Sequence, residues 1–371
     1  MANTKKSLKK SPWIELTVMF AVLIMSYIAM ILISRGSATP SGGMALTNIT
    51  GLLFGFFLLG FAIATISVLA GIGGGVIFTP IMLAFTPIDS LIIRATGLTV
   101  AMFSGLIATG PFMKSGVGNL KLAIFCCCGY GIGGFIGAQG ALLVASRMGA
   151  SGEGIIRIML GGIILAIAIY FLKGGVKREW PEAKKVDHFS QWLGLTQSYY
   201  EPSLGKVVSY RLTRAAVGVL TMVGVGVISG FFGLGGGWAI VPVMSLVMLV
   251  PLKVAAATSG VLIGMGTSIT IWPYLLSGAI IPLFVAPWLV GHVMGGIIGA
   301  HLLIRVRARS VRYILVGVML FSSFGLAVKG LNKLGCISDV PRATYIIVLL
   351  IIMALVSLAI IGKFPKLRGG R

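Results

Sequence analysis

Two glycine-rich stretches decide the fold: Gly71-Ile72-Gly73-Gly74-Gly75-Val76-Ile77-Phe78-Thr79-Pro80 and, at an ungapped offset of 162 residues, Gly233-Leu234-Gly235-Gly236-Gly237-Trp238-Ala239-Ile240-Val241-Pro242. Both lie within apolar sequence that reads as membrane-spanning. Clustered glycines break helices, because they lack a Cβ and leave the backbone free. Within a bilayer, a break is tolerated only where the freed N–H and C=O groups find partners or line a wet cavity. Two matched breaks therefore indicate where a binding site would be built.

The composition indicates an all-α integral membrane protein. Of 371 residues, 57% are hydrophobic and 10% are charged, and the mean hydropathy is +1.04. No soluble core needs so much apolar surface. The apolar run 13–34 is too long for a signal-peptide core, so we interpret it as an uncleaved span. The net charge of +22 comes from basic residues between apolar runs, which indicates orientation by the positive-inside rule rather than binding of nucleic acid.

The residues that could carry catalysis or bind a metal form no recognisable constellation. The four cysteines contain no C-x-x-C pair, and three of them are consecutive, so they predict neither a disulfide framework nor a metal site: Cys126, Cys127, Cys128 and Cys336. No nucleophile–base arrangement is present either. We therefore expect a protein that is not an enzyme and that holds no cofactor.

The apolar runs form two sets of five segments. The first set is predicted at 47–70, 75–86, 90–113, 119–146 and 154–173, and the second at 211–233, 237–250, 254–277, 280–303 and 309–328, followed by a last span at 343–362. At the offset of 162, matched residues include Thr96/Thr258, Pro111/Pro273, Gly133/Gly295 and Arg147/Arg309. Chance apolar similarity would not keep glycines, prolines and a threonine in register, so the chain contains an internal duplication.

Five crossings in each repeat make the two halves inverted. With both termini in the cytoplasm, this arrangement places most of the 30 basic residues on the cytoplasmic side. If the segments 75–86 and 237–250 only dipped into the membrane and returned, the two sides would carry nearly equal charge, so the positive-inside rule favours the inverted arrangement. Segment 75–86 makes a helix of only about 18 Å. It is therefore tilted or ends in a water-filled vestibule, which Arg94 would face.

The predicted domains follow from these segments. They are an extra N-terminal helix and loop over 1–46, repeat 1 over 47–173, a cytoplasmic linker over 174–210, repeat 2 over 211–328, and an extra C-terminal helix with a basic tail over 329–371. Within the linker, the stretch 198–210 has the alternation and the Pro…Gly turn of a β-hairpin. A regulatory role for this linker stays open beside the simpler role of joining the halves.

The polar residues favour an anion as the ligand. Neither repeat carries a carboxylate near the middle of a span, and cation transporters need such groups. Backbone N–H groups, helix N-termini and hydroxyls can instead hold an anion. The predicted site residues are Gly71, Gly73, Gly74, Gly75, Pro80 and Thr96 in the first half, and Gly233, Gly235, Gly236, Gly237, Pro242, Thr258 and Ser259 in the second. Arg94 and Trp238 are predicted at the vestibule and the wall of the site.

Other glycines and a histidine in the two repeats are interpreted as packing residues. Small residues let membrane helices approach closely, and Gly133, Gly134, Gly137, Gly295, Gly296 and Gly299 have the spacing of one helix face. His292 aligns with Tyr130, so the repeat offers no second histidine. We interpret His292 as a packing residue, with a proton-linked role as the alternative.

The paired motifs resemble the sulfite exporter TauE/SafE family of membrane transporters. The G-x-G-G-G-x-x-x-x-P phrases are followed by Ala95-Thr96 in the first half and by Ala255-Ala256-Ala257-Thr258-Ser259 in the second. The resemblance covers roughly 47–330 and implies movement of a small sulfur-containing anion, such as sulfite, thiosulfate, sulfoacetate or another sulfonate, across the prokaryotic cytoplasmic (inner) membrane. The spans 13–34 and 343–362 are additions to the common core.

The sequence thus predicts about 10–12 transmembrane segments in two inverted five-segment repeats with glycine-broken short helices. We expect transport of a small anionic substrate by alternating access, within a lipid bilayer and without nucleic acid. An anion channel and a non-transporting membrane scaffold are the alternatives. The identity of the anion, the direction of transport, the coupling ion, the oligomeric state and the role of the terminal helices do not follow from the sequence.

Overall fold

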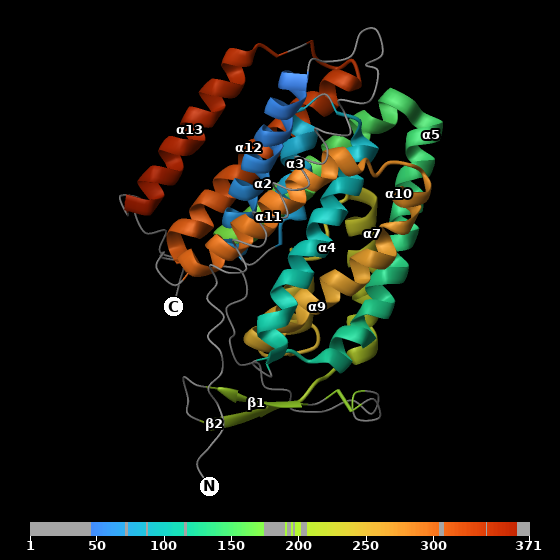
Figure 1. The fold of residues 1–371 in the computed structure, drawn as a ribbon, viewed down its shortest axis with the longest axis vertical. Coiled ribbons are helices and arrows are strands. Elements are labelled where there is room, and N and C mark those ends of the chain that lie inside the picture. The colour runs from blue at the N-terminus through green and yellow to red at the C-terminus, as the bar shows by residue number, and fades with distance from the viewer. Residues whose placement is uncertain are drawn as a thin grey trace.

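The chain folds into a bundle of helices with a small hairpin at one end (Figure 1). The computed structural model describes residues 46–70, 73–86, 88–114, 117–173, 190, 194–195, 197–201, 206–303, 308–338 and 340–361. In this part of the chain the helices are α2 (Leu46–Ala70), α3 (Gly75–Phe85), α4 (Ser90–Lys114), α5 (Leu120–Leu172), α7 (Ala215–Phe232), α8 (Ile240–Leu246), α9 (Leu252–Thr270), α10 (Trp272–Leu276), α11 (Pro282–Leu303), α12 (Ala308–Lys333) and α13 (Arg342–Ile361). The predicted span 13–34 lies outside the described residues.

The helices have the lengths and the composition of membrane spans. Within the described residues, seven are long and apolar enough to cross a membrane, and three shorter apolar helices accompany them at Gly75–Phe85, Pro282–Ile298 and Ala343–Leu358. The prediction of an all-α integral membrane protein with glycine-broken short helices is confirmed. Many large apolar side chains point outward, including Leu220 and Leu350, as expected where lipid rather than water surrounds the bundle.

α5 contains two of the predicted segments, joined at a sharp kink. Gly149 interrupts it with φ 50° and ψ −130°, a conformation that glycine adopts without steric cost. The two apolar parts are Leu120–Gly149 and Ser151–Leu172. They correspond to the segments predicted at 119–146 and 154–173.

Helix boundaries recur at the offset that relates the two sequence repeats. α4 and α9 begin at Ser90 and Leu252, and α5 and α11 begin at Leu120 and Pro282. Both pairs of starting residues are 162 positions apart. The inversion of one repeat relative to the other stays a prediction.

The same pair of equivalent helices packs together twice, each time with one helix from each half of the sequence. α5 packs on α7, and α11 packs on α2, with glycines at both interfaces. A Cβ on Gly137 would overlap the Val227 carbonyl, and one on Gly295 would overlap the Phe61 carbonyl. The predicted role of these glycines in close helix packing therefore has a direct geometric basis. Within the pair α5–α12, Ser323 Oγ donates to the Gly161 carbonyl over 2.8 Å, and these two residues are again 162 apart.

The hairpin consists of β1 (Gln197–Glu201) and β2 (Lys206–Tyr210), which pair antiparallel. It lies in the stretch where the sequence predicts a hairpin. Asn119, at the start of α5, donates through Nδ2 to the Leu195 carbonyl and to Tyr210 Oη, both over 2.8 Å. These two bonds attach the hairpin to the helical bundle (Figure 1).

Candidate functional site

We define the two glycine breaks as residues 71–75 and 233–237, and their described parts, 73–75 and 233–237, lie directly against each other. Thr79 Oγ1 on α3 donates to the Gly233 carbonyl over 2.6 Å in a buried position. A Cβ on Gly75 would lie 2.7 Å from the Leu234 carbonyl oxygen. Segments from the two halves of the sequence thus form one buried centre. Gly71 lies outside the described residues.

α4 completes this centre through Gly97, which the sequence analysis did not single out. A Cβ on Gly97 would lie 2.5 Å from the Gly233 carbonyl oxygen and would overlap Thr79 Oγ1. Only glycine fits where three backbone segments meet so closely. The repeat register could have drawn attention to Gly97, because it aligns with the predicted site residue Ser259.

The first glycine break leads directly into a helix. Gly73 has φ +75°, and α3 starts at Gly75, with Gly74 as its N-cap residue. The first N–H groups of a helix have no acceptor within the helix. Pro80 lies inside α3 and has no N–H, so it also leaves one helix carbonyl without its usual donor. The break therefore presents polar backbone within an apolar surrounding.

The second glycine break shares a hydrogen-bond pattern with the first, because the Gly74 carbonyl accepts from Ile77 N and the Gly236 carbonyl from Ala239 N, but its helix starts later. Gly233 and Gly235 have φ +71° and +68°. Ser229 Oγ donates to the Gly235 carbonyl over 2.8 Å, and the Gly236 carbonyl accepts from Ala239 N over 3.1 Å. α8 begins only at Ile240 and ends at Leu246, so the predicted start of this segment at 237 is wrong by three residues. Gly237 lies in the turn, and Pro242 lies within α8.

Each glycine break is faced by a buried ring from an equivalent position of the other half. A Cβ on Gly74 would overlap the His292 imidazole, and a Cβ on Gly236 would lie 2.7 Å from Tyr130 Cε2. Tyr130 and His292 are 0% and 2% exposed. Among the described residues, neither Tyr130 Oη nor His292 Nε2 has a hydrogen-bond partner.

The sequence analysis did not include Tyr130 in the site and interpreted His292 as a packing residue, with a proton-linked role as the alternative. The structure places the two rings at equivalent positions relative to the two breaks. A buried polar atom without a partner is costly, so its presence at both positions makes this centre the candidate site.

The predicted hydroxyl donors are engaged within the protein in this conformation. Thr96 Oγ1 donates to the Ile92 carbonyl and Ser259 Oγ to the Ala256 carbonyl, each over 2.8 Å. Serine and threonine within helices commonly bond back to such carbonyls. Thr258 Oγ1 accepts from Asn119 N over 3.0 Å. Its position ties α9 to the start of α5.

Arg94, predicted to face a vestibule, is buried, and Trp238, predicted at the wall of the site, is half-buried. Arg94 is 0% exposed, and its Nη2 donates to Ser90 Oγ over 3.1 Å. A Cβ on Gly233 would lie 2.5 Å from Arg94 Cα, so the arginine backbone packs against the second break. Trp238 is half-buried between two hydrophobic clusters, and its Nε1 has no partner among the described residues.

Comparison with known proteins gives a family match. A family model described as sulfite exporter TauE/SafE matches residues 56–326. The chain belongs to the TauE/SafE family. Both glycine breaks, Tyr130 and His292 lie within the matched residues, whereas α13 lies beyond them. The family assignment identifies the chain as a multi-pass membrane transporter, which fits the expectation that it is not an enzyme.

One curated relative carries a matching name. The chain is 26% identical to "Probable membrane transporter protein YunE" of Bacillus subtilis (strain 168) over 281 residues, which cover 74% of this chain and 97% of the relative. No solved structure matches the chain significantly.

Proposed function

We propose that the protein carries a small sulfur-containing anion, such as sulfite, thiosulfate or a sulfonate, by alternating access at the centre formed by the two glycine breaks. The observation that carries this proposal is the pair of buried rings, Tyr130 and His292, which face the two breaks and whose Oη and Nε2 have no hydrogen-bond partner among the described residues. The family name supports the class of anion.

The chemistry of the centre suits an anion. The phenol hydroxyl of Tyr130 donates a hydrogen bond, and His292 donates through Nε2 in one of its tautomers. Backbone N–H groups at the start of α3 add donors and the positive end of a helix dipole. The backbone of Arg94 packs against the second break, and its guanidinium donates to Ser90 Oγ.

The close contact between the breaks suits the closed stage of a transport cycle. Gly75 and Gly97 lack side chains where three backbones meet, so the backbones of the two halves approach each other closely at this point. In an open stage, the halves would part and an anion would replace the contacts between the breaks. The Thr79–Gly233 hydrogen bond would then break and re-form in each cycle.

The test is saturable anion flux in proteoliposomes, with sulfite, thiosulfate, sulfate and a small sulfonate as substrates and with an imposed potential or pH gradient. Tyr130→Phe should raise KM about tenfold or more, because a hydrogen bond to a charged group contributes about 1.5–3 kcal/mol. His292→Phe should have an effect of similar size. Tyr170→Phe is the matched control, because Tyr170 Oη on the same helix α5 also has no partner among the described residues.

The outcomes separate the proposal from its alternatives. Unchanged flux in Tyr130→Phe and His292→Phe would contradict the assignment of the site. Flux that rises linearly with anion concentration would indicate a channel. A folded protein that moves none of these anions, nor another organic acid, would favour a scaffold.

The proposed orientation in the cytoplasmic membrane has its own test. Both termini and the hairpin are proposed to be cytoplasmic, from the distribution of basic residues. A cysteine placed at the exposed Ser198 should then react with an impermeant reagent only from the cytoplasmic side. The exposed native Cys336 should react only from outside, and the reverse pattern would overturn the orientation.

A further inference from the structure

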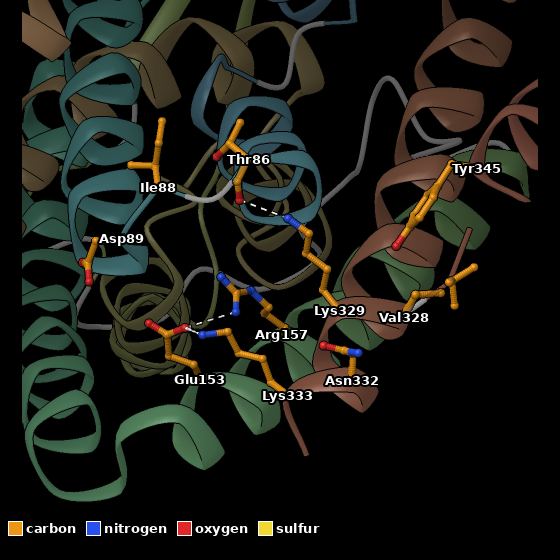
Figure 2. A pocket seen from close by; sticks show the side chains of 11 residues that line it. Thr86, Ile88, Asp89, Glu153, Arg157, Val328, Lys329, Asn332, Lys333 and Tyr345 are labelled. Atoms are coloured by element: carbon orange, nitrogen blue, oxygen red, sulfur yellow. Dashed lines mark hydrogen bonds and ion pairs between the residues drawn. The ribbon is translucent and has the colours of Figure 1, made fainter. Parts of the chain in front are cut away.

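A polar pocket of about 500 Å³ lies beyond the centre described above (Figure 2). It forms where the end of α3, the start of α4, the second part of α5, the end of α12 and the start of α13 meet. Its lining residues are Thr86, Ile88, Asp89, Glu153, Arg157, Val328, Lys329, Asn332, Lys333, Val340 and Tyr345. α3 connects the two places, with Gly74 before its first residue and Thr86 after its last. A helix of this length separates them by about 16 Å.

Cations outnumber the carboxylates that can neutralise them in this pocket. Glu153 forms ion pairs with two cations: its Oε2 lies 3.1 Å from Arg157 Nη1 and 2.5 Å from Lys333 Nζ. Its Oε1 accepts from Ser90 Oγ over 3.1 Å. Asp89 is exposed and accepts from Leu91 N over 2.8 Å at the start of α4. One shared carboxylate therefore balances a pair of cations only in part.

Two cations retain donors that no carboxylate accepts. Arg157 is 5% exposed, and its Nε has no hydrogen-bond partner within the described residues. Lys329 Nζ donates to the Thr86 carbonyl over 3.0 Å, which leaves further hydrogens on the ammonium. In the part of the chain that the structure describes, no carboxylate lies within ion-pair distance of Lys329. Figure 2 shows Arg157 and Lys329 on the same side of the pocket.

The same pocket also has apolar lining. Val328, Val340 and the ring of Tyr345 contribute to it, and Tyr345 comes from α13 (Figure 2). Cationic and apolar side chains in one pocket suit a ligand that has an anionic head and a short apolar body. A bare inorganic anion would use only the cationic side chains.

We infer that this pocket is a second anion site, which binds a small organic anion with its head at Arg157 and Lys329 and its apolar part against Val340 and Tyr345. A short alkyl sulfonate or carboxylate and the head of an anionic lipid share this chemistry. Glu153 competes with the ligand for Arg157, because both are anions that the same guanidinium binds. The site does not depend on transport at the glycine breaks.

The test measures binding of propanesulfonate and methanesulfonate to the purified full-length protein by calorimetry, in detergent free of anionic lipid. Lys329→Met should weaken propanesulfonate binding about tenfold, the loss expected for one charge-assisted hydrogen bond. Glu153→Gln should strengthen binding, because a competing anion is removed. Lys121→Met, at an exposed lysine at the start of α5, is the matched control and should change nothing.

Further variants separate this site from the transport centre and from a lipid site. Because the transport centre is also proposed to take sulfonates, the pocket is measured in the Tyr130→Phe background. There Lys329→Met should still weaken propanesulfonate binding, and Tyr345→Ala should lower the preference for propanesulfonate over methanesulfonate. In nanodiscs, displacement of propanesulfonate by phosphatidylglycerol but not by phosphatidylcholine would identify the lipid head as the occupant. Equal propanesulfonate affinity in the folded wild type, Lys329→Met and Glu153→Gln would overturn the site.

Discussion

The two glycine breaks have nearly the same sequence but different local structures. In the first, α3 starts at Gly75 and continues for 11 residues. In the second, a turn precedes α8, which has only 7 residues. The glycines keep a common geometry, because Gly73 and Gly235 both have a positive φ, and the breaks differ in where the following helix starts and how long it is. The differences lie in the residues between them and in what each break contacts.

The hydrogen bond between the breaks runs in one direction only. Thr79 donates from α3 to the second break, whereas Val241, at the equivalent position 162 residues later, has no polar atom to return. Trp238 replaces the Val76 of the first half. The first half thus supplies the hydrogen-bond donor on α3, and the second half supplies the carbonyl acceptor in the turn before α8. The following substitutions test this asymmetry.

The largest effect is expected where the breaks touch backbone to backbone. Gly75→Ala would bring a Cβ to 2.7 Å from the Leu234 carbonyl oxygen and 2.8 Å from the Gly97 carbonyl oxygen. A backbone carbonyl cannot avoid the added Cβ by changing rotamer, as a side chain could. We therefore expect a loss of about 3 kcal/mol in the free energy of unfolding and a loss of flux. Gly162→Ala is the control, because nothing lies within 4 Å of its Cβ. Equal melting temperatures for the two variants would refute the direct contact.

A smaller effect is expected where each break meets a ring. Gly74→Ala would overlap the His292 ring, whereas Gly236→Ala would meet mainly the flexible end of Ile240. We expect a loss of about 2 kcal/mol for Gly74→Ala and a smaller loss for Gly236→Ala. The double variant Gly74→Ala/His292→Ala should recover part of the loss, as a thermodynamic cycle would measure. Purely additive losses would show that the ring does not limit this break.

The smallest effect concerns the one-way hydrogen bond. Thr79→Val leaves the Gly233 carbonyl without its buried donor, so we expect a loss of about 1 kcal/mol in the free energy of unfolding. Val241→Thr is the reverse exchange at the equivalent position. It should not raise the free energy of unfolding by a matching amount, because position 241 is near the start of α8, whereas Thr79 lies further inside α3. Thermal unfolding in detergent measures both. A gain in Val241→Thr equal to the loss in Thr79→Val would show that the two breaks are equivalent after all.

Most helix boundaries could be predicted from the sequence because they depend on local chemistry. Apolar runs set the spans, and the predicted starts at 75 and 90 match α3 and α4. The late start of α8 could not be predicted, because the glycine phrase is the same in both halves. There the turn is fixed by Ser229, which donates to Gly235, and such a bond depends on the folded path of the chain.

The sequence by itself determined the all-α membrane class, the internal duplication and the two glycine breaks, because composition and register are properties of the chain alone. Only the tertiary structure brought the breaks into contact, placed Gly97 between them, brought Tyr130 and His292 against them, and gathered Arg157 and Lys333 around one carboxylate, with Lys329 in the same pocket. Most of those juxtapositions join residues more than 100 positions apart. Their energies depend on distances between backbones and charges, which no local pattern of residues encodes.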